Sequence, residues 1–512
     1  MTDSMSSPKI VIVGAGIAGL CAGVYARKSG FEAEIVEMAS SSGGLATSWK
    51  RQQYTFETCL HWLLGSNPAS PAHSLWQEVF DIGELKFVDL ENFAQIESSQ
   101  GQSITLSRNL DLLEKELRRV SPKDTKIIQR LVRGMRKLSK GEIPLATNGI
   151  FDVLVQGVRM VPYLPEIRHW SRMSVEELGA QFENPLLKRL FSGDREQKQL
   201  SALALVLSFA WMSKKDAGYP IGGSQAIIRL IEKKFRELGG TIRFNSSVDR
   251  ILVENDQAVG VHLRDGHEIQ ADWVVSAADG HSTLFDWIPS RYRDRRAADP
   301  YKNFQTFPSY IQVSLGMGRD LSREPAFFTR VLDNSLDIDP KTSTDQLTFR
   351  VFHFDPSFAP AGKTAVTCFI PTRNYAYWLD LSKQDPQGYA LKKAQLADAV
   401  IEVLDQRTPG LRQDVEVIDV STPATVIRQT GNWKGSMEGF LVTPQVGFMP
   451  LRMNLPGLKR LMMIGQWVMP GGGLPSGLMT GRRCIQSICR TERRKFYSGP
   501  NIPEHLQIPR AA

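Results

Sequence analysis

The apolar positions nearest the N-terminus form a short continuous run, which a glycine-rich turn and a compact helix follow. Residues 9–13 (KIVIV) are almost all apolar, the pattern of a strand buried on both faces. Residues 20–28 are small and apolar enough for a packed helix, which Gly30 ends, and residues 33–36 begin a second strand. The pattern predicts a βαβ unit, which is the start of an α/β fold.

A second block of regular pattern covers residues 219–279. Apolar residues recur at helical spacing after Ser224, and Gly239-Gly240 ends that helix. The positions that follow have the pattern of strands, with turn residues between them. We expect strands at residues 241–244, 248–254, 258–263 and 271–276.

A third block lies near the C-terminus. Residues 460–464 (RLMMI) predict a buried strand, residues 465–473 a glycine-rich loop, and residues 475–489 a helix with proline in its first turn.

Two long insertions separate these blocks. Residues from about 105 to 218 look mostly helical, and Ser174-x-x-Glu177 within them has the pattern of a capping box. Residues from about 300 to 424 mix both kinds of element. There we expect strands near residues 310–317, 347–354 and 365–370, and a helix near 389–404.

Composition places the chain among ordinary globular proteins. It has 512 residues, of which 42% are hydrophobic and 23% charged, and a net charge of +8. These values exclude a disordered or fibrous protein, and the charge suggests only an anionic surface or ligand. The five cysteines include no C-x-x-C pair, which argues against a disulfide framework or structural zinc. With a polar N-terminus and no apolar run long enough to span a bilayer, we expect a cytoplasmic protein, soluble or peripheral.

The glycines of the first block form a G-x-G-x-x-G motif between a strand and a helix. In such motifs Gly14 permits the tight turn, Gly16 lets the backbone approach a diphosphate, and Gly19 lets the helix pack closely on the strand. The helix N-terminus offers free N–H groups to the same anion. A chance glycine-rich turn is the alternative, and the strand-and-helix context argues against it.

Acidic and glycine residues after the second strand refine this interpretation. Glu37 closes that strand at the distance from Gly14 where a carboxylate bonds the hydroxyls of a nucleotide ribose. Gly43 and Gly44 follow, and paired glycines leave backbone amides free to face a phosphate or a ring. Alone the pair would be an ordinary loop. Together with the motif and Glu37 it favours FAD over NAD.

With these residues the chain resembles the flavoprotein family of phytoene desaturases, carotenoid isomerases and retinol saturases, within the amine-oxidase-like group. The resemblance covers nearly the whole chain in the family's order. Its most discriminating block is IGQWVMPGGGLPSG at 464–477. The other blocks are residues 11–37, 41–49, 56–65, 219–227 and 248–266.

The resemblance implies a set of residues that bind FAD. They are Gly14, Ala15, Gly16, Gly19, Glu37, Gly43, Gly44, Val248, Gly465, Gln466, Gly473 and Pro475. The first four would hold the diphosphate, Glu37 the adenosine ribose, and Val248 the adenine through its backbone. There are two departures from the family pattern: Gln466 stands where many relatives carry Asp, and Leu45 follows Gly44 in place of Arg.

The resemblance also implies the architecture, an α/β fold in which discontinuous segments assemble one Rossmann-like FAD-binding domain. We expect this domain to comprise residues 1–105, 219–300 and 425–495. An inserted mixed α+β substrate domain, facing the membrane, would comprise residues 106–218 and 301–424, and residues 496–512 would form a C-terminal tail.

The activity implied is that of an FAD-dependent oxidoreductase acting on carbon–carbon bonds of a hydrophobic polyene, isoprenoid or lipid. Desaturation, saturation and cis–trans isomerisation all use this architecture in the family. Two alternatives remain open. One is an amine-oxidase-like flavoenzyme, and the other is a non-catalytic escort protein that binds a prenyl group or lipid in the same fold.

His61, within FETCLHWLLG, is the best candidate for a catalytic side chain. It follows the flavin-proximal glycines, and retinol-saturase-like proteins also carry a His there. It would donate a proton or tune the flavin. The alternative is a hydrogen-bonded structural histidine. The eight histidines show no metal-ligand spacing, so no metal is expected.

A basic amphipathic segment at residues 125–140 suggests an anionic membrane surface as a partner. Apolar residues occupy one arc of this predicted helix, and Lys and Arg residues lie mostly on the opposite arc. The following apolar stretch, residues 150–164, would form the lip of a substrate entry tunnel. The alternative is a helix packed on the substrate domain with a solvated basic face. No motif that reads nucleic acid accompanies the segment, so nucleic acid is not expected as a partner.

Overall fold

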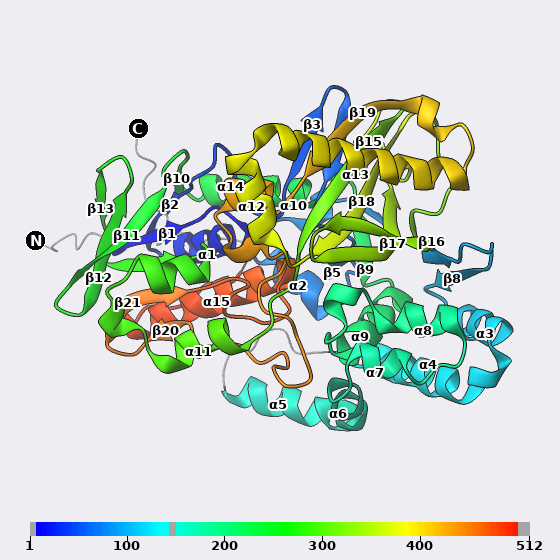
Figure 1. The fold of residues 1–512 in the computed structure, drawn as a ribbon. Coiled ribbons are helices and arrows are strands. Elements are labelled where there is room, and N and C mark those ends of the chain that lie inside the picture. Colours follow the sequence, from blue (N-terminus) through cyan, green and yellow to red (C-terminus); the bar gives the residue numbers. More distant parts are fainter. Residues whose placement is uncertain (1–6, 143–149, 500–512) are drawn as a thin grey trace, which may run out of the picture.

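The structure is a computed structural model that describes residues 7–142 and 150–499. Its first sheet has nine strands, and Figure 1 shows it at the left of the view, with the N-terminal strand inside it. The central order is β10 (Thr241–Arg243), β2 (Glu32–Val36), β1 (Lys9–Val13), β14 (Trp273–Ser276), β21 (Leu458–Met463), β12 (Gln257–Leu263) and β11 (Val248–Glu254). The short strands β13 (Glu268–Gln270) and β20 (Asn454–Leu455) pair with β12 and β21.

The strands from which the sequence analysis predicted an α/β fold form the parallel centre of this sheet. β1 pairs in parallel with β2 and β14, and β14 pairs in parallel with β21. Since parallel strands are covered on both faces, the apolar run of β1 is buried as its sequence predicts. The carboxyl ends of these strands all meet at one edge, so the loops that follow them share one place.

Three helices pack at this sheet: α1 (Ile17–Lys28), α10 (Gly223–Glu237) and α15 (Gly473–Thr491). The contact between α1 and α15 is close because α15 presents glycine to α1. A Cβ on Gly477 would lie 2.5 Å from Ile17 and 3.1 Å from the amide of Ala18. The first and the last blocks of the sequence are therefore tightly bound to each other.

The second sheet has seven strands and lies at the upper right of Figure 1. Its order is β19 (Val415–Ser421), β15 (Ser309–Met317), β18 (Thr364–Thr372), β17 (Thr342–Val351), β16 (Phe327–Asp339), β7 (Asn92–Glu97) and β8 (Ser103–Ser107). All neighbours are antiparallel except β16 and β7, which are parallel. The helices α12 (Tyr375–Gln384), α13 (Pro386–Arg407) and α14 (Pro423–Thr430) accompany it.

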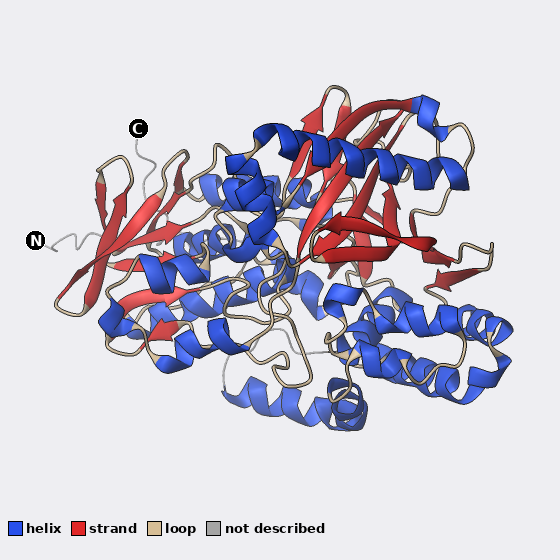
Figure 2. Cartoon of the chain, in the orientation of Figure 1, coloured by secondary structure: helices blue, strands red, loops and turns tan. Residues whose placement is uncertain are grey.

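The first insertion is helical, as the sequence predicts, and forms a separate bundle that Figure 2 shows below the second sheet. Its helices are α3 (Leu110–Val120), α4 (Thr125–Ser139), α5 (Ile150–Met160), α6 (Leu164–Ser171), α7 (Val175–Gly179), α8 (Pro185–Ser192) and α9 (Ala202–Ser213). Most of them share one hydrophobic core with residues of β7 and β8. The predicted capping box of Ser174 and Glu177 starts α7.

Short elements connect these parts. They are β3 (Ser48–Arg51), β4 (Tyr54–Glu57), β5 (Leu63–Leu64), β6 (Phe87–Val88), β9 (Ala217–Pro220), α2 (Pro71–Gln77) and α11 (Arg295–Asn303). β9 pairs with both β5 and β6, so the chain leaves for the helical insertion and returns at the same small sheet. Within the described residues, no helix is long and apolar enough to cross a membrane.

The division into an FAD domain and a substrate domain stays a proposal, and the sheets suggest one change to it. Residues 92–107 lie within the proposed FAD domain up to residue 105, yet β7 and β8 belong to the second sheet, where Phe328 pairs with Gln95. The local pattern of a strand does not reveal which distant strand it will join.

Candidate functional site: a cofactor cavity at the sheet edge

A cavity of about 830 Å³ opens where the carboxyl ends of β1, β2, β14 and β21 meet. Its wall includes Gly14 and Glu37 at one end of the first sheet, Leu474 of α15, and Tyr310 from the second sheet. In open α/β sheets, ligands bind outside the carboxyl ends of parallel strands. The cavity therefore occupies the expected place and also reaches the second sheet.

Most of the residues expected to bind FAD line this cavity. They are Gly14, Gly16, Glu37, Gly43, Gly44, Val248, Gly465, Gln466 and Gly473. Ala15, Gly19 and Pro475 lie behind the wall and are not part of it. The structure thus brings together residues from all three sequence blocks.

The glycines of the first motif have two different tasks. A Cβ on Gly19 would lie 1.9 Å from the carbonyl oxygen of Gly14, so glycine is needed there for the helix to approach the turn. A Cβ on Gly16 would meet only the Gly43 carbonyl oxygen, at 3.9 Å. Protein packing therefore does not require glycine at position 16. The absence of a side chain there instead leaves space in the cavity.

Glu37 is held at the end of β2 by backbone amides. Its Oε2 accepts from Ala15 N at 2.6 Å, its Oε1 accepts from Ala39 N at 2.8 Å, and it is 6% exposed. Burial raises the pKa of Glu37 above its ordinary value, and the amides oppose that effect. The carboxyl group is thus fixed between the motif and the cavity wall, in place to bond a ribose. Ala15 acts from behind the wall by anchoring this carboxylate.

The segment before β11 forms the same end of the cavity. Val248 is buried, and Ser246, Ser247, Asp249 and Arg264 line the cavity around it. Serine hydroxyls and backbone amides can bond a purine edge or a ribose, and the Arg264 guanidinium can face a phosphate. This is the end where the adenosine part of a dinucleotide would lie.

Gln466 and the start of α15 form the wall near the other end. Gln466 Nε2 donates to Asn432 Oδ1 at 3.1 Å, and Trp467 Nε1 donates to the same oxygen at 3.0 Å. Gln466, which stands where many relatives carry Asp, therefore has a polar partner of its own in Asn432. Gly473, Leu474, Ser476 and Gly477 bring the N-terminus of α15 to the cavity, and Pro475 holds the first turn.

Two segments of the wall were missed by sequence reasoning. One is residues 277–279 after β14, and the other is residues 425–438, around α14 and the loop after it. Asp279 joins them, because it accepts hydrogen bonds from the amides of Ser282 at 2.8 Å and Trp433 at 2.9 Å. Burial raises the pKa of Asp279 to about 6. The first segment could have been found, since residues 271–276 predict a buried strand whose end shares the same edge.

His61 does not line this cavity. It lies beside Arg350 of β17, whose Nη2 is 2.6 Å from His61 Nε2, and its ring lies 5.8 Å from that of Phe327. Desolvation and the neighbouring guanidinium lower the pKa of His61 well below its ordinary value, although the side chain keeps exposed surface. The imidazole is therefore neutral near pH 7, so it does not supply a proton as an imidazolium ion. A catalytic role for His61 remains a prediction.

The segment proposed to meet a membrane, residues 125–140, is a helix as expected, but its apolar arc faces the protein. Ile128, Leu131, Val132 and Met135 of α4 are all 0% exposed. An amphipathic helix that packs its apolar arc inward has none left for a membrane. The expectation that this arc enters a bilayer is wrong. The sequence predicts the apolar arc of this helix, but it does not show which surface covers that arc.

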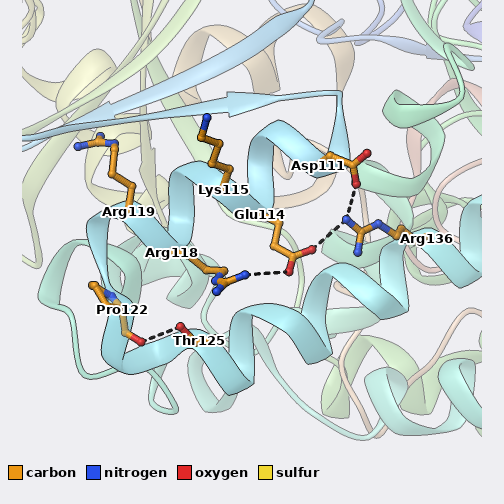
Figure 3. Close-up of a pocket in the computed structure, with 8 residues that line it drawn as sticks. All are labelled: Asp111, Glu114, Lys115, Arg118, Arg119, Pro122, Thr125 and Arg136. Atoms are coloured by element: carbon orange, nitrogen blue, oxygen red, sulfur yellow. Dashed lines mark hydrogen bonds and ion pairs between the residues drawn. The ribbon is translucent and has the colours of Figure 1, made fainter.

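Part of the basic face of α4 is also neutralised. Figure 3 shows a shallow charged hollow between α3 and α4, where Arg136 pairs with Asp111 and Glu114. Arg130 pairs with Glu166 at 2.8 Å. The hollow is surrounded by paired surface charges and lies away from the cofactor cavity, so it has no sign of a ligand site.

The residues present fit FAD. A Cβ on Gly44 would approach only Gly16, at 3.6 Å, so the backbone at both glycines faces open cavity. Glu37 stands at one end and the N-terminus of α15 near the other, the arrangement that a ribose and a diphosphate-linked group need. Within the described part of the chain, no group of three or more His, Cys, Asp or Glu side chains is placed to hold a metal ion.

Comparison with known proteins gives relatives over the full length. The chain is 22% identical to a 4,4'-diapophytoene desaturase of Methylomonas sp, over 95% of this chain and 96% of that one. It is 24% identical to a zeta-carotene-forming phytoene desaturase of Myxococcus xanthus, over 94% of each. It is 22% identical to a chloroplastic prolycopene isomerase of Daucus carota, over 93% of this chain and 79% of that one.

Solved structures share the fold. An oxidoreductase from Methanosarcina mazei superposes with a TM-score of 0.60 at 17% identity, over 93% of this chain and 100% of that one. A putrescine oxidase variant superposes with a TM-score of 0.62 at 16% identity, over 95% of this chain and 99% of that one. Residues 17–489 match the family described as flavin containing amine oxidoreductase, and the chain belongs to that family, as an FAD-dependent oxidoreductase.

Proposed function

We propose that the protein oxidises, reduces or isomerises carbon–carbon double bonds of a hydrophobic polyene. The observation that carries this proposal is the full-length similarity to proteins named as carotenoid desaturases and as a carotenoid isomerase. When bound, FAD supplies two-electron transfer, and the protein supplies position and electrostatics. The cavity residues described above would hold the cofactor.

The position of the cavity between the sheets supports an apolar substrate. Thr58, Cys59 and Tyr310 line its end at the second sheet. Beyond Cys59 the chain reaches Trp62, whose ring lies 5.7 Å from that of Trp211 on α9. One aromatic side chain of the helical insertion therefore contacts a residue three positions after Cys59 of the cavity wall, and apolar walls of this kind suit a long apolar molecule.

The experiment that tests this proposal is anaerobic mixing of the FAD-bound protein with acyclic carotenoids. Phytoene, a lycopene and a poly-cis lycopene would be supplied in vesicles, and flavin absorbance and the product pigments would be followed. We expect bleaching of the flavin or a changed pigment with at least one of them. Bleaching by putrescine and other primary amines, with every polyene unchanged, would show an amine oxidase instead.

The proposed membrane contact moves from α4 to the neighbouring α5–α6 segment. Four apolar side chains recur there at helical spacing and remain exposed: Leu154 at 62%, Val158 at 72%, Val161 at 57% and Leu164 at 50%. We call this set the apolar stripe. Exposed apolar stripes of this kind mark interaction surfaces.

Basic side chains flank the apolar stripe and argue for an anionic bilayer as its partner. Arg159, Arg168 and Arg172 are exposed, whereas Glu166 in the same segment is buried and paired with Arg130. Each basic residue near an anionic surface contributes about 1 kcal/mol, less in salt. A carotenoid-type substrate dissolves in bilayers, so a peripheral enzyme would collect it there.

Co-sedimentation with vesicles tests this surface. We expect binding to vesicles rich in phosphatidylserine, weaker binding in high salt, and a loss of at least about tenfold in Val158→Glu. The matched control is Leu391→Glu, because Leu391 is also an exposed apolar residue, at 61%, but lies on α13 beside the second sheet. Equal binding by the two variants would contradict the assignment to the apolar stripe.

A further inference from the structure

One carboxyl group of the cofactor cavity has no part in holding the fold. Glu438 follows the turn at Trp433–Gly435 and lines the cavity. Its backbone is fixed, because a Cβ on Gly472 would lie 2.4 Å from the Glu438 carbonyl oxygen. The glycine-rich loop before α15 therefore packs directly on Glu438 and sets where its side chain enters the cavity.

The Glu438 carboxyl group has no hydrogen-bond or ion-pair partner among residues 7–142 and 150–499. A nearby buried acid outside the cavity wall is, by contrast, fully occupied. Glu57, which is 0% exposed, accepts from the amides of Cys59, Leu60 and Ser224 and from the Ser224 hydroxyl. Glu438 is half-buried in the cavity wall, and a ligand in the cavity would cover the rest of its carboxyl group. A covered polar group without a partner costs free energy, which suggests a role toward that ligand.

The surroundings of Glu438 decide its protonation. Desolvation raises its pKa to about 7, and no cationic side chain of the described part of the chain pairs with it. The titratable group that faces it is Cys59, whose thiol pKa burial raises far above neutrality. Arg350 lies beyond Cys59, and Asp279 is occupied by the amides of Ser282 and Trp433. Glu438 can therefore exchange a proton near neutral pH.

We propose that Glu438 is the acid–base residue for the carbon–carbon bond chemistry at the flavin, an inference that rests on the proposed function. Forming a double bond removes a hydride from one carbon and a proton from its neighbour. Bound FAD would supply the acceptor for the hydride and its two electrons, and the Glu438 carboxylate would take the proton and later release it to water. In the reducing direction the same carboxylic acid returns the proton.

Other side chains at this end of the cavity are less suited to the step. The Tyr310 hydroxyl is hydrogen-bonded to Thr58, and burial raises its pKa to about 12. Cys59 stays protonated for the reason given above. His61 is outside the cavity wall and contacts Arg350. A general base must have a pKa near the working pH, and Glu438 meets that requirement.

The test compares Glu438→Gln and Glu438→Asp with the wild type, all with FAD bound. Glu416→Gln is the control, because Glu416 is paired with Lys363 at the surface. The first readout needs no substrate: infrared spectroscopy of the carboxylic-acid band as a function of pH. We expect a carboxyl band that titrates near pH 7 in the wild type and in Glu416→Gln, distinct from the band of Asp279 near pH 6, and lost in Glu438→Gln.

The second readout is the rate of flavin reduction by the polyene that reduces the wild type. We expect Glu438→Gln to be slower by at least about 100-fold, the usual contribution of a positioned base, with partial recovery in Glu438→Asp. If the wild type is reduced and Glu438→Gln is reduced as fast, the inference is overturned while the proposed function stands. If no polyene reduces the flavin of the wild type and none is itself changed, the proposed function fails. Persistence of the band that titrates near pH 7 in Glu438→Gln would overturn the assignment of Glu438 independently.

Discussion

At the scale of single residues, glycine 16 and glycine 19 separate cofactor binding from folding. Gly16 has φ of −73°, which any residue can adopt, and its Cβ direction is open. We expect Gly16→Val to fold with its helix content intact but to bind FAD at least about tenfold more weakly, because the side chain would occupy the place of the diphosphate. Circular dichroism and the ratio of flavin to protein absorbance measure the two effects.

The matched variant is Gly19→Val. Its Cβ would overlap the Gly14 carbonyl oxygen at 1.9 Å, so helix α1 would have to move away from the turn. We expect this variant to lose the folded structure itself and not only the cofactor. Full occupancy of FAD in Gly16→Val would rule out the assignment of the motif to the diphosphate.

His61 carries a prediction about pH. Desolvation and Arg350 hold the folded pKa of His61 below that of an unfolded histidine, so the unfolded chain takes up the proton first. The wild type should therefore lose stability through this group as pH falls below about 6.5, the ordinary pKa of histidine. In His61→Gln that part of the loss should disappear, with flavin content unchanged. Urea unfolding at pH 7.5 and pH 5.5 measures the change in the free energy of unfolding. An identical loss in the wild type and in His61→Gln would contradict the prediction that folded His61 is neutral.

The site residues that the sequence reveals belong to local motifs, whereas those that it does not reveal depend on contacts between distant parts of the chain. Gly14, Gly16 and Glu37 belong to a local motif whose spacing follows from one βαβ unit, so the sequence shows them. Glu438 lies in GSMEGF, which matches no motif, and it reaches the cavity only because Gly472, distant in the chain, packs on it. Likewise, nothing in FETCLHWLLG shows that His61 would contact Arg350.

At the scale of elements, α15 is bound to the end of α2 by an ion pair that is largely removed from water. Arg482 of α15 is 3% exposed, and its Nε donates to Glu78 Oε2 at 2.7 Å. Tyr25 of α1 donates to the same oxygen at 2.7 Å. One carboxylate thus connects the first and the last blocks of the chain behind the cofactor cavity.

We expect Arg482→Ala to lower the free energy of unfolding by about 3 kcal/mol, because it leaves the Glu78 carboxylate without its cation. Arg412→Ala is the control, since Arg412 pairs with Asp398 and Glu402 at the exposed end of α13 and should show little change. Urea denaturation followed by circular dichroism makes the comparison. Equal and small losses in both would show that the pair adds no stability.

Elements with a clear local signal were predicted well, and those defined by distant pairing were not. The strands at 9–13 and 248–254 match β1 and β11, because each is bounded by turn residues. The long strand β16 was missed, since its middle residues are polar and exposed and it joins β7 across more than two hundred residues. For α4, the sequence predicts a helix but not which surface covers its apolar arc.

At the scale of the whole molecule, the chain passes repeatedly between the two sheets. After β2 it supplies β7 and β8 to the second sheet, returns for β10 to β14, and crosses again for β15 to β19 before β21. Neither sheet can be cut from the other as one continuous piece, and the cavity lies where they meet. Folding of both should therefore be coupled to FAD.

We expect one cooperative unfolding transition for the FAD-bound protein, with release of flavin fluorescence at the same temperature as loss of ellipticity. Free FAD at one hundred times its Kd should raise the free energy of unfolding by about 2.7 kcal/mol. Calorimetry with and without added FAD measures this. Two separate transitions, with flavin released in only one, would show that the sheets unfold independently.

The position of Cys59 offers a direct reporter of the cofactor. Four of the five thiols, those of Cys21, Cys368, Cys484 and Cys489, are buried, whereas Cys59 is partly exposed on the wall of the cavity. Alkylation of the folded apoprotein should therefore modify a single peptide in mass spectrometry, slowly because burial raises the thiol pKa. Bound FAD should protect that peptide from alkylation. The extent of Cys59 modification therefore measures the fraction of protein that holds FAD, even in a crude extract and without any knowledge of the substrate.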